Sequence, residues 1–157
     1  MRMIWRSPLS LLRLCRVQDA IPVDVHALAC RLGFAIAPEF RLSQAVDGAI
    51  IPARKLIIVN ARTAWVRQRF TVAHELGEFF LADRGMAPVL ALTSCLLARN
   101  SHHHQCNRWA AELLIPGHLL ARMARPYNPG RLARIFLVSE ECMRHRCEIE
   151  CKRREQE

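Results

Sequence analysis

The segment from Arg69 to Glu78, which reads RFTVAHELGE, limits the possible folds of this chain more than any other. Its end, HELGE, differs in one position from H-E-x-x-H, a helical pattern that places two metal ligands one turn apart with a carboxylate between them. The position of the second histidine is taken by Glu78. Because a catalytic zinc takes three protein ligands, a fold that uses this helix must bring a further ligand to it from elsewhere.

Length and composition predict one globular domain. The chain has 157 residues, of which 52% are hydrophobic and 24% charged, a balance that is typical of a folded domain and not of disorder. No apolar run approaches the ~20 residues that cross a bilayer, so we expect no membrane span. Arg6 and Arg13 interrupt the apolar N-terminus, and no small-residue cleavage site follows. We therefore expect an N-terminal extension over residues 1–20, a domain over 21–150 and a charged tail over 151–157.

Charge and cysteine usage bear on partners and location. The net charge of +9 would suit a polyanion, but no basic stripe lies between aromatic residues, so nucleic-acid binding is possible and not favoured. The seven cysteines are odd in number and scattered, which does not resemble a disulfide framework. A reduced, cytoplasmic location is the simpler interpretation.

Hydrophobic periodicity predicts an α+β domain that is mostly helical. Helices are expected over residues 23–32, 64–83, 102–114 and 117–123, and in two pieces over 131–150. Strands are expected over residues 34–37, 49–51 and 56–59, with a hairpin loop at 52–55. Residues 86–100 are expected to form a short helix or an ordered loop. The sheet is therefore small, about three-stranded and antiparallel.

Capping residues are expected to set three of the helix starts. Asp24 lies at the start of the first helix, and Ser139 precedes the last one. Asn60 and Thr63 are both possible caps for the helix that carries HELGE.

His74, Glu75 and Glu78 have the spacing of a hydrolytic metal site. Residues four apart lie on one face of a helix, so His74 and Glu78 could bind one divalent ion together. Glu75 lies ~100° round the helix, close enough to act as a general base on a metal-bound water without binding the metal. The alternative is that the motif arose by chance on a solvated helix face.

The run His102-His103-His104 is the obvious source of a third ligand. Three consecutive helical residues point in different directions, so spacing does not decide which of them faces inward. We expect one to do so. A histidine run that is exposed and binds metal weakly, with no function, is the alternative.

Two long segments resemble signatures of the ImmA/IrrE family of metallo-endopeptidases. Residues 67–77 read RQRFTVAHELG, close to R-x-R-F-T-x-A-H-E-x-G-H, and residues 105–116 read QCNRWAAELLIP, similar to E-x-x-C/A-N-x-F-A-A-x-L-L-x-P. The similarity extends from about residue 21 to residue 147. It implies a zincin-like fold and a metal held by two histidines and the glutamate that begins the second signature. It also implies a cytoplasmic protease that acts on repressor-type transcription factors, often those of mobile elements.

The chain departs from that family pattern at two positions that compensate each other. Glu78 replaces the second histidine, and His103, four residues before Asn107, replaces the glutamate. The ligand set becomes His74, Glu78 and His103, with the same composition and charge. We therefore predict an intact Zn²⁺ site with exchanged ligands, in which Glu75 is the base and Asn107 hydrogen-bonds a ligand.

The predicted function is metal-dependent cleavage of a repressor, expected to be a separate helix-turn-helix protein because this chain shows no clear helix-turn-helix of its own. The alternative is a decayed site. The chain would then keep only the scaffold and act as a regulatory module that binds a repressor or DNA.

Overall fold

The computed structural model describes residues 7–82, 91–94, 101–123 and 126–155. In chain order the elements are α1 (Pro8–Leu14), α2 (Val25–Arg31), β1 (Ala35–Glu39), β2 (Val46–Ile51), the 3-10 turn η2 (Pro52–Arg54), β3 (Leu56–Asn60), α3 (Trp65–Leu81), β4 (Ala91–Ser94), α4 (Ser101–Leu114), α5 (Gly117–Leu120), α6 (Pro129–Phe136) and α7 (Glu140–Arg154). The mostly helical α+β class is confirmed. None of the helices in the described ranges is both long and apolar enough to cross a bilayer.

The sheet differs in two respects from the three-stranded antiparallel sheet that the sequence predicts. Its strand order is β1-β3-β2-β4, and β1 runs parallel to β3, with Ala35 opposite Leu56. A parallel pair needs a long connection, and residues 40–55, which contain β2, supply it. The fourth strand lies within residues 86–100, for which we expected a helix or loop, and it pairs antiparallel with β2.

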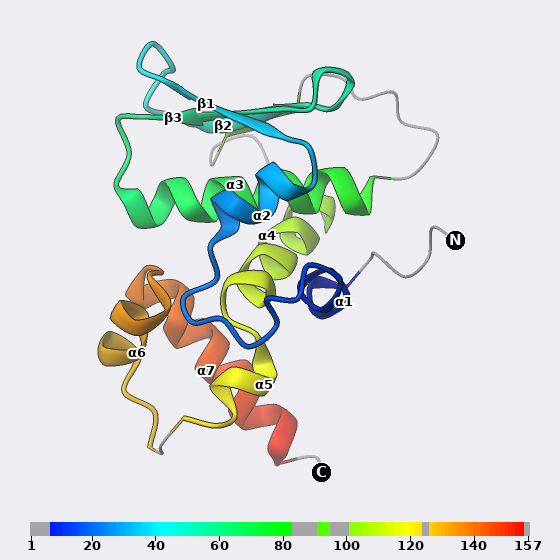
Figure 1. The fold of residues 1–157 in the computed structure, drawn as a ribbon. Coiled ribbons are helices and arrows are strands. Elements are labelled where there is room, and N and C mark those ends of the chain that lie inside the picture. The colour runs from blue at the N-terminus through cyan, green and yellow to red at the C-terminus, as the bar shows by residue number, and fades with distance from the viewer. Residues whose placement is uncertain (1–6, 83–90, 95–100, 124–125, 156–157) are drawn as a thin grey trace.

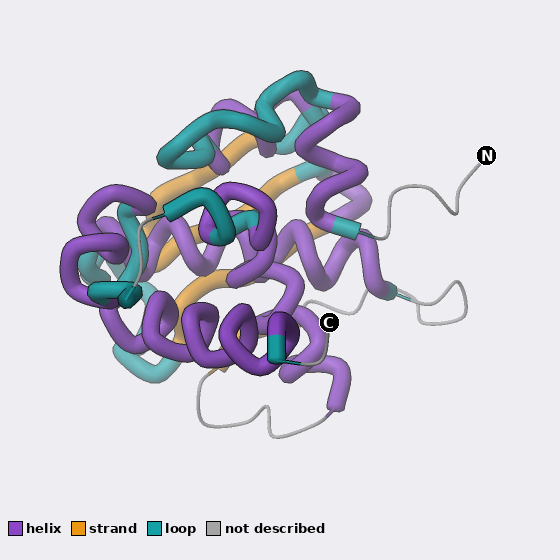
Figure 2. Tube along the Cα trace, turned by 90° about the horizontal axis from the view of Figure 1, so that it is seen from below, coloured by secondary structure: helices purple, strands orange, loops and turns teal. Residues whose placement is uncertain are grey.

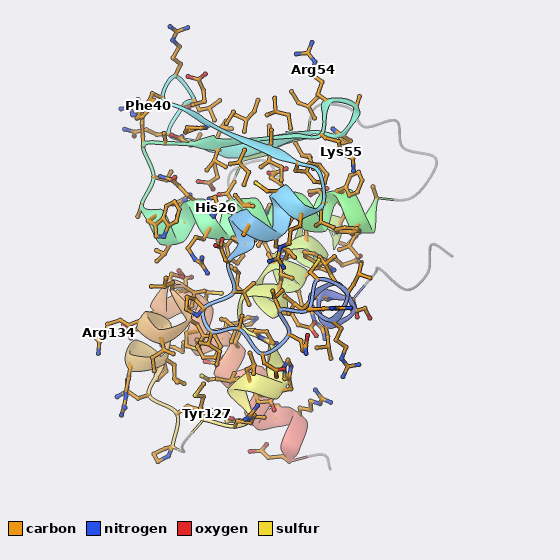
Figure 3. The ribbon with its side chains drawn as sticks, viewed as in Figure 1. His26, Phe40, Arg54, Lys55, Tyr127 and Arg134 are labelled. Carbon is orange, nitrogen blue, oxygen red and sulfur yellow. The ribbon has the colours of Figure 1, made fainter. Side chains whose placement is uncertain are left out.

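The predicted hairpin joins β2 to β3, with Ile51 opposite Leu56. Lys55 closes the turn in the left-handed region, at φ 49°. Its ammonium group lies 4.5 and 4.4 Å from the ring centroids of Phe34 and Phe79, so the tip of the hairpin is held against the end of α3 (Figure 3).

The helices lie on one face of the sheet. α3 runs along that face, and α4 crosses α3 on the side away from the strands (Figure 1). Seen from below, the helices lie in front of the strands (Figure 2). α3 is therefore the central element, since it touches the sheet on one side and α4 on the other.

Two glycines allow α3 to approach its neighbours closely. A Cβ on Gly48 of β2 would lie 2.5 Å from both the carbonyl oxygen of Ile58 and Cγ2 of Thr71 on α3. A Cβ on Gly77 of α3 would meet the Trp109 ring at 3.3 Å and the backbone of Cys106 at 3.4 Å. The absence of a side chain at these positions sets the spacing of β2, α3 and α4.

Two predicted caps are present and a third is not. The Asp24 side chain accepts from the Ala27 N–H at 3.0 Å, and Ser139 accepts from the Cys142 N–H at 3.2 Å. α3 begins after Ala64 with no side-chain cap, so neither Asn60 nor Thr63 caps it.

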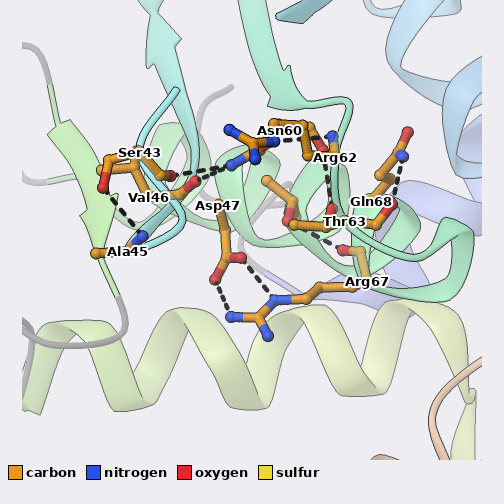
Figure 4. A network of polar contacts seen from close by, with 10 residues as sticks. Ser43, Ala45, Val46, Asp47, Asn60, Arg62, Thr63, Arg67 and Gln68 are labelled. Atoms are coloured by element: carbon orange, nitrogen blue, oxygen red, sulfur yellow. Dashed lines mark hydrogen bonds and ion pairs between the residues drawn. The ribbon is translucent and has the colours of Figure 1, made fainter. Parts of the chain in front are cut away.

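Asn60 instead joins two loops. Its side-chain amide donates to the carbonyls of Ser43 and Val46 at 3.1 and 2.8 Å, and its oxygen accepts from the Arg62 N–H at 3.0 Å (Figure 4). The residue therefore ties the end of β3 to the start of β2, because a local polar side chain can replace backbone partners in a turn.

Both ends of the described chain are helical. Leu11 and Leu12 of α1 are fully buried in the main core, and α1 packs against α4. At the other end, α7 continues into the charged tail, through Cys151 to Arg154. The segment over residues 8–14 thus stabilises the helix that supplies His103.

Candidate metal centre

The crossing of α3 and α4 brings together the three residues proposed as ligands. One ligand atom each from His74, Glu78 and His103 lies within 4.8 Å of the others. The rings of His74 and His103 have centroids 4.7 Å apart. His74 is 2% exposed, and His103 is half-buried. The imidazole at 103 therefore faces the pair on α3, as an exchanged site requires.

Asn107 fixes which nitrogen of His74 is available. Nδ1 of His74 lies 2.8 Å from Oδ1 of Asn107, one turn beyond His103 on α4. An amide oxygen only accepts, so Nδ1 donates in this contact and Nε2 is the ring nitrogen that faces Glu78. Nε2 lies 3.4 Å from Oε1 of Glu78 and is buried, with no hydrogen-bond partner among the described residues.

These atoms fit a divalent cation. A buried nitrogen without a partner is costly, and a cation would satisfy it. Two neutral imidazoles and one carboxylate are donors that Zn²⁺ accepts readily. Burial lowers the pKa of His103, and the nearby His74 lowers it further, which favours the neutral, metal-binding form.

Glu78 is ionised by its contacts. Burial alone would raise the pKa of this carboxyl, but contacts with His74 and His102 outweigh burial and lower the pKa to about 2. Oε2 of Glu78 lies 2.7 Å from Nε2 of His102. The carboxylate thus meets a histidine through each of its oxygens.

His102 and Cys106 form a second group that sequence reasoning missed. We expected one of the three consecutive histidines to face inward, but His102 and His103 both lie beside Glu78, and His104 is exposed. Sγ of Cys106 lies 3.6 Å from Nε2 of His102. The spacing of 102 and 106, which places them on one helix face, is the signal that marks this pair.

Ligand atoms of Glu78, His102 and Cys106 also lie within 4.8 Å of one another. Burial raises the pKa of the Cys106 thiol well above its usual range, and the carboxylates of Glu78 and Glu75 add to the effect. The thiol is therefore protonated when no cation is near.

Glu75, the expected general base, is fully buried on α3. Its carboxylate helps to raise the pKa of the Cys106 thiol, after burial and Glu78. It is not among the residues that line the groove described below.

An open groove of about 610 Å³ runs past His74 and His103. Its walls come mainly from α3, α4 and α7. They carry the basic side chains Arg67, Arg108, His145 and Arg146 together with the acidic Asp47 and Glu141 and several apolar residues. The candidate ligands can therefore be reached by a large molecule, while their helices remain packed.

Two arginines of the first signature hold α3 in position. Arg67 donates to both carboxylate oxygens of Asp47 on β2, at 2.6 and 3.0 Å, at the edge of the groove (Figure 4). Arg69 is buried and donates to the carbonyls of Leu137 and Val23 at 3.0 and 2.8 Å. No pattern in the sequence marks Asp47 as the partner of Arg67.

Comparisons with known proteins identify the family and the fold. A peptidase family described as the IrrE N-terminal-like domain matches residues 25–148. A solved structure titled "Mycobacterium tuberculosis transcriptional regulator" superposes with a TM-score of 0.63 at 17% sequence identity, covering 88% of this chain and 45% of that one. At this identity the likeness concerns the fold alone. No curated protein is significantly similar in sequence.

Proposed function

Because the chain belongs to the family of IrrE N-terminal-like domains, a peptidase family, we propose that it is a metal-dependent endopeptidase that cleaves a repressor-type transcription factor. The observation that carries this proposal is the convergence of His74, Glu78 and His103 from two helices beside an open groove. The choice of a repressor as substrate rests on the resemblance of the two sequence signatures.

In this proposal His74, Glu78 and His103 would hold Zn²⁺. The ion would supply Lewis acidity, which makes water acidic enough to attack near neutral pH and polarises a peptide carbonyl. Asn107 keeps the proton of His74 on Nδ1. The basic side chains of the groove bind the substrate chain and orient it.

Glu75 takes a proton from the attacking water at its carboxylate and returns it to the leaving amine. This role requires the buried Glu75 side chain to reach the groove, which it does not line. We therefore expect Glu75→Gln to keep its zinc and lose cleavage, since the amide conserves shape and cannot accept the proton. Undiminished cleavage by this variant would remove Glu75 from the mechanism.

Zinc binding tests the site itself. Protein purified without a metal-affinity step is stripped with a chelator, reloaded, and analysed for zinc and for cleavage of whichever helix-turn-helix repressor is encoded beside it. We expect His103→Ala to bind one equivalent less than wild type and to lose cleavage. His104→Ala is the matched control, because His104 is exposed on the same helix. Equal zinc in the two variants would overturn the proposal.

The second candidate is a regulatory module without activity. Two observations favour it: Oε2 of Glu78 is already hydrogen-bonded to His102, and Glu75 is buried away from the groove. Such a protein would bind the same repressor equally well with and without a chelator, as fluorescence anisotropy can measure, and would leave it uncut.

We propose a cytoplasmic location for either function, which the odd and scattered cysteines support.

A further inference from the structure

We propose that Glu78, His102 and Cys106 form a second metal position, which takes a thiophilic divalent ion such as Zn²⁺. The first position is the group of His74, Glu78 and His103, and the two positions share the Glu78 carboxylate. The proposal goes beyond the peptidase function, because it concerns a separate donor set and a different donor chemistry. It assigns a role to the imidazole of His102 and the thiol of Cys106, which are not ligands in the first position.

The donors converge from both helices. His102 and Cys106 lie one turn apart on α4, and Nε2 of His102 is 2.7 Å from Oε2 of Glu78 and 3.6 Å from Sγ of Cys106. Oxygen, nitrogen and sulfur donors within 4.8 Å of one another suit zinc, and the thiolate favours it over magnesium or calcium. The His102 side chain is 38% exposed, so an ion can reach the group from solvent.

The orientation of the Glu78 carboxylate separates the two positions. Oε1 faces Nε2 of His74 at 3.4 Å, while Oε2 faces Nε2 of His102. One oxygen is thus directed to each group, which is the arrangement of a carboxylate that bridges two ions. Carboxylate-bridged pairs of ions about 3.5–4 Å apart are a known type of hydrolytic centre.

Close helix packing makes the second group possible. Gly77 precedes Glu78, and its lack of a side chain lets α3 approach the backbone of Cys106. A larger residue at 77 would move the carboxylate of Glu78 away from the thiol.

Binding at this position balances in charge and protons. A divalent ion would offset the charge of the Glu78 carboxylate and take the thiolate of Cys106 as a ligand, with the thiol proton released to solvent.

Titration with Co²⁺ tests the second position directly, because a thiolate bound to cobalt absorbs in the near ultraviolet. We expect chelator-stripped, reduced wild-type protein to bind two equivalents in equilibrium dialysis and to develop this charge-transfer band. Cys106→Ala should bind one equivalent and show no band. His103→Ala should also bind one equivalent but keep the band, since it lacks only the first position.

Two further variants complete the test. Cys30→Ser is the control for loss of a thiol, because Cys30 is exposed on α2, and it should match wild type. His102→Ala, at a half-exposed position, should lose the band as Cys106→Ala does, and it decides the result if circular dichroism shows that Cys106→Ala is unfolded. No band in wild type, or a band that persists in both variants, would overturn the proposal. If only the peptidase site is wrong, His103→Ala will bind as much Co²⁺ as wild type while the band still depends on Cys106.

Discussion

Gly48→Ala should destabilise the protein by crowding the contact between β2 and α3. The added methyl group would lie 2.5 Å from the carbonyl oxygen of Ile58 and from Cγ2 of Thr71. Ordinary contacts of this kind begin near 3.4 Å, so β2 must move by about 1 Å. The Ile58 oxygen belongs to the neighbouring strand and cannot rotate away.

The expected cost can be estimated from overpacking in other cores. Inserting a methyl group into a well-packed site costs about 1–3 kcal/mol, and a clash with backbone favours the upper half of that range. For a domain of this size, a loss of about 2–3 kcal/mol lowers the melting temperature by roughly 4–12 °C. Thermal unfolding followed by circular dichroism measures this shift, and urea unfolding gives the free energy itself.

Gly117→Ala is the matched control. A Cβ at this position would meet only the carboxylate of Glu150 at 3.4 Å and the guanidinium of Arg146 at 3.6 Å, both at the ends of long side chains. Since Gly117 begins α5, we expect this variant to be as stable as wild type or slightly more stable. A Gly48→Ala protein with the same melting temperature as wild type would refute this packing of β2 on α3.

Three further substitutions test other contacts. Ser139→Ala removes the acceptor for the Cys142 N–H at the start of α7 and should cost about 1 kcal/mol in urea unfolding, whereas Ser139→Asp should not. Arg69→Met leaves two buried carbonyls without their donor and should cost about 3 kcal/mol, and a near-neutral result would contradict the buried bonds. Asn107→Leu should weaken zinc binding by about 10–100-fold in competition with a chelator, while Asn107→Asp, which keeps the acceptor, should retain it.

Local sequence pattern predicted most of the helices and the central hairpin. The apolar stripe of the HELGE helix predicts residues 64–83, and α3 occupies Trp65–Leu81. The helical pattern that ends before Pro116 and Gly117 predicts residues 102–114, and α4 occupies Ser101–Leu114. These elements are predictable because their periodicity and their terminating residues act over a few residues.

The sheet was less predictable because its pairing depends on distant residues. A short apolar run does not reveal whether its partner runs parallel or antiparallel, so the pairing of β1 with β3 could not be deduced from residues 35–39. The run around Ala91–Ser94 does not alternate between polar and apolar residues, and nothing local distinguishes a strand from a buried helix there.

The candidate site was also only partly predictable, because part of it depends on residues that are distant in the sequence. His74 and Glu78 could be predicted as a pair, because a helix fixes their relation. The choice among three consecutive histidines depends on how α4 crosses α3, which Gly77 and the residues opposite it determine. The sequence therefore predicted His103 through its register with the family signature, and it gave no reason to expect His102 beside Glu78 as well.

Relative to the family pattern, glutamate and histidine have exchanged places between position 78 on α3 and position 103 on α4. This exchange changes the donor geometry as well as conserving the charge. With the carboxylate on α3, its second oxygen points at His102, one turn before a buried thiol. An imidazole at position 78 offers one free nitrogen once the other is protonated, so it would serve one ion at a time. A carboxylate offers two oxygens and can connect two donor groups. The exchange at 78 and 103 therefore preserves the composition of the first group and creates the geometric condition for the second.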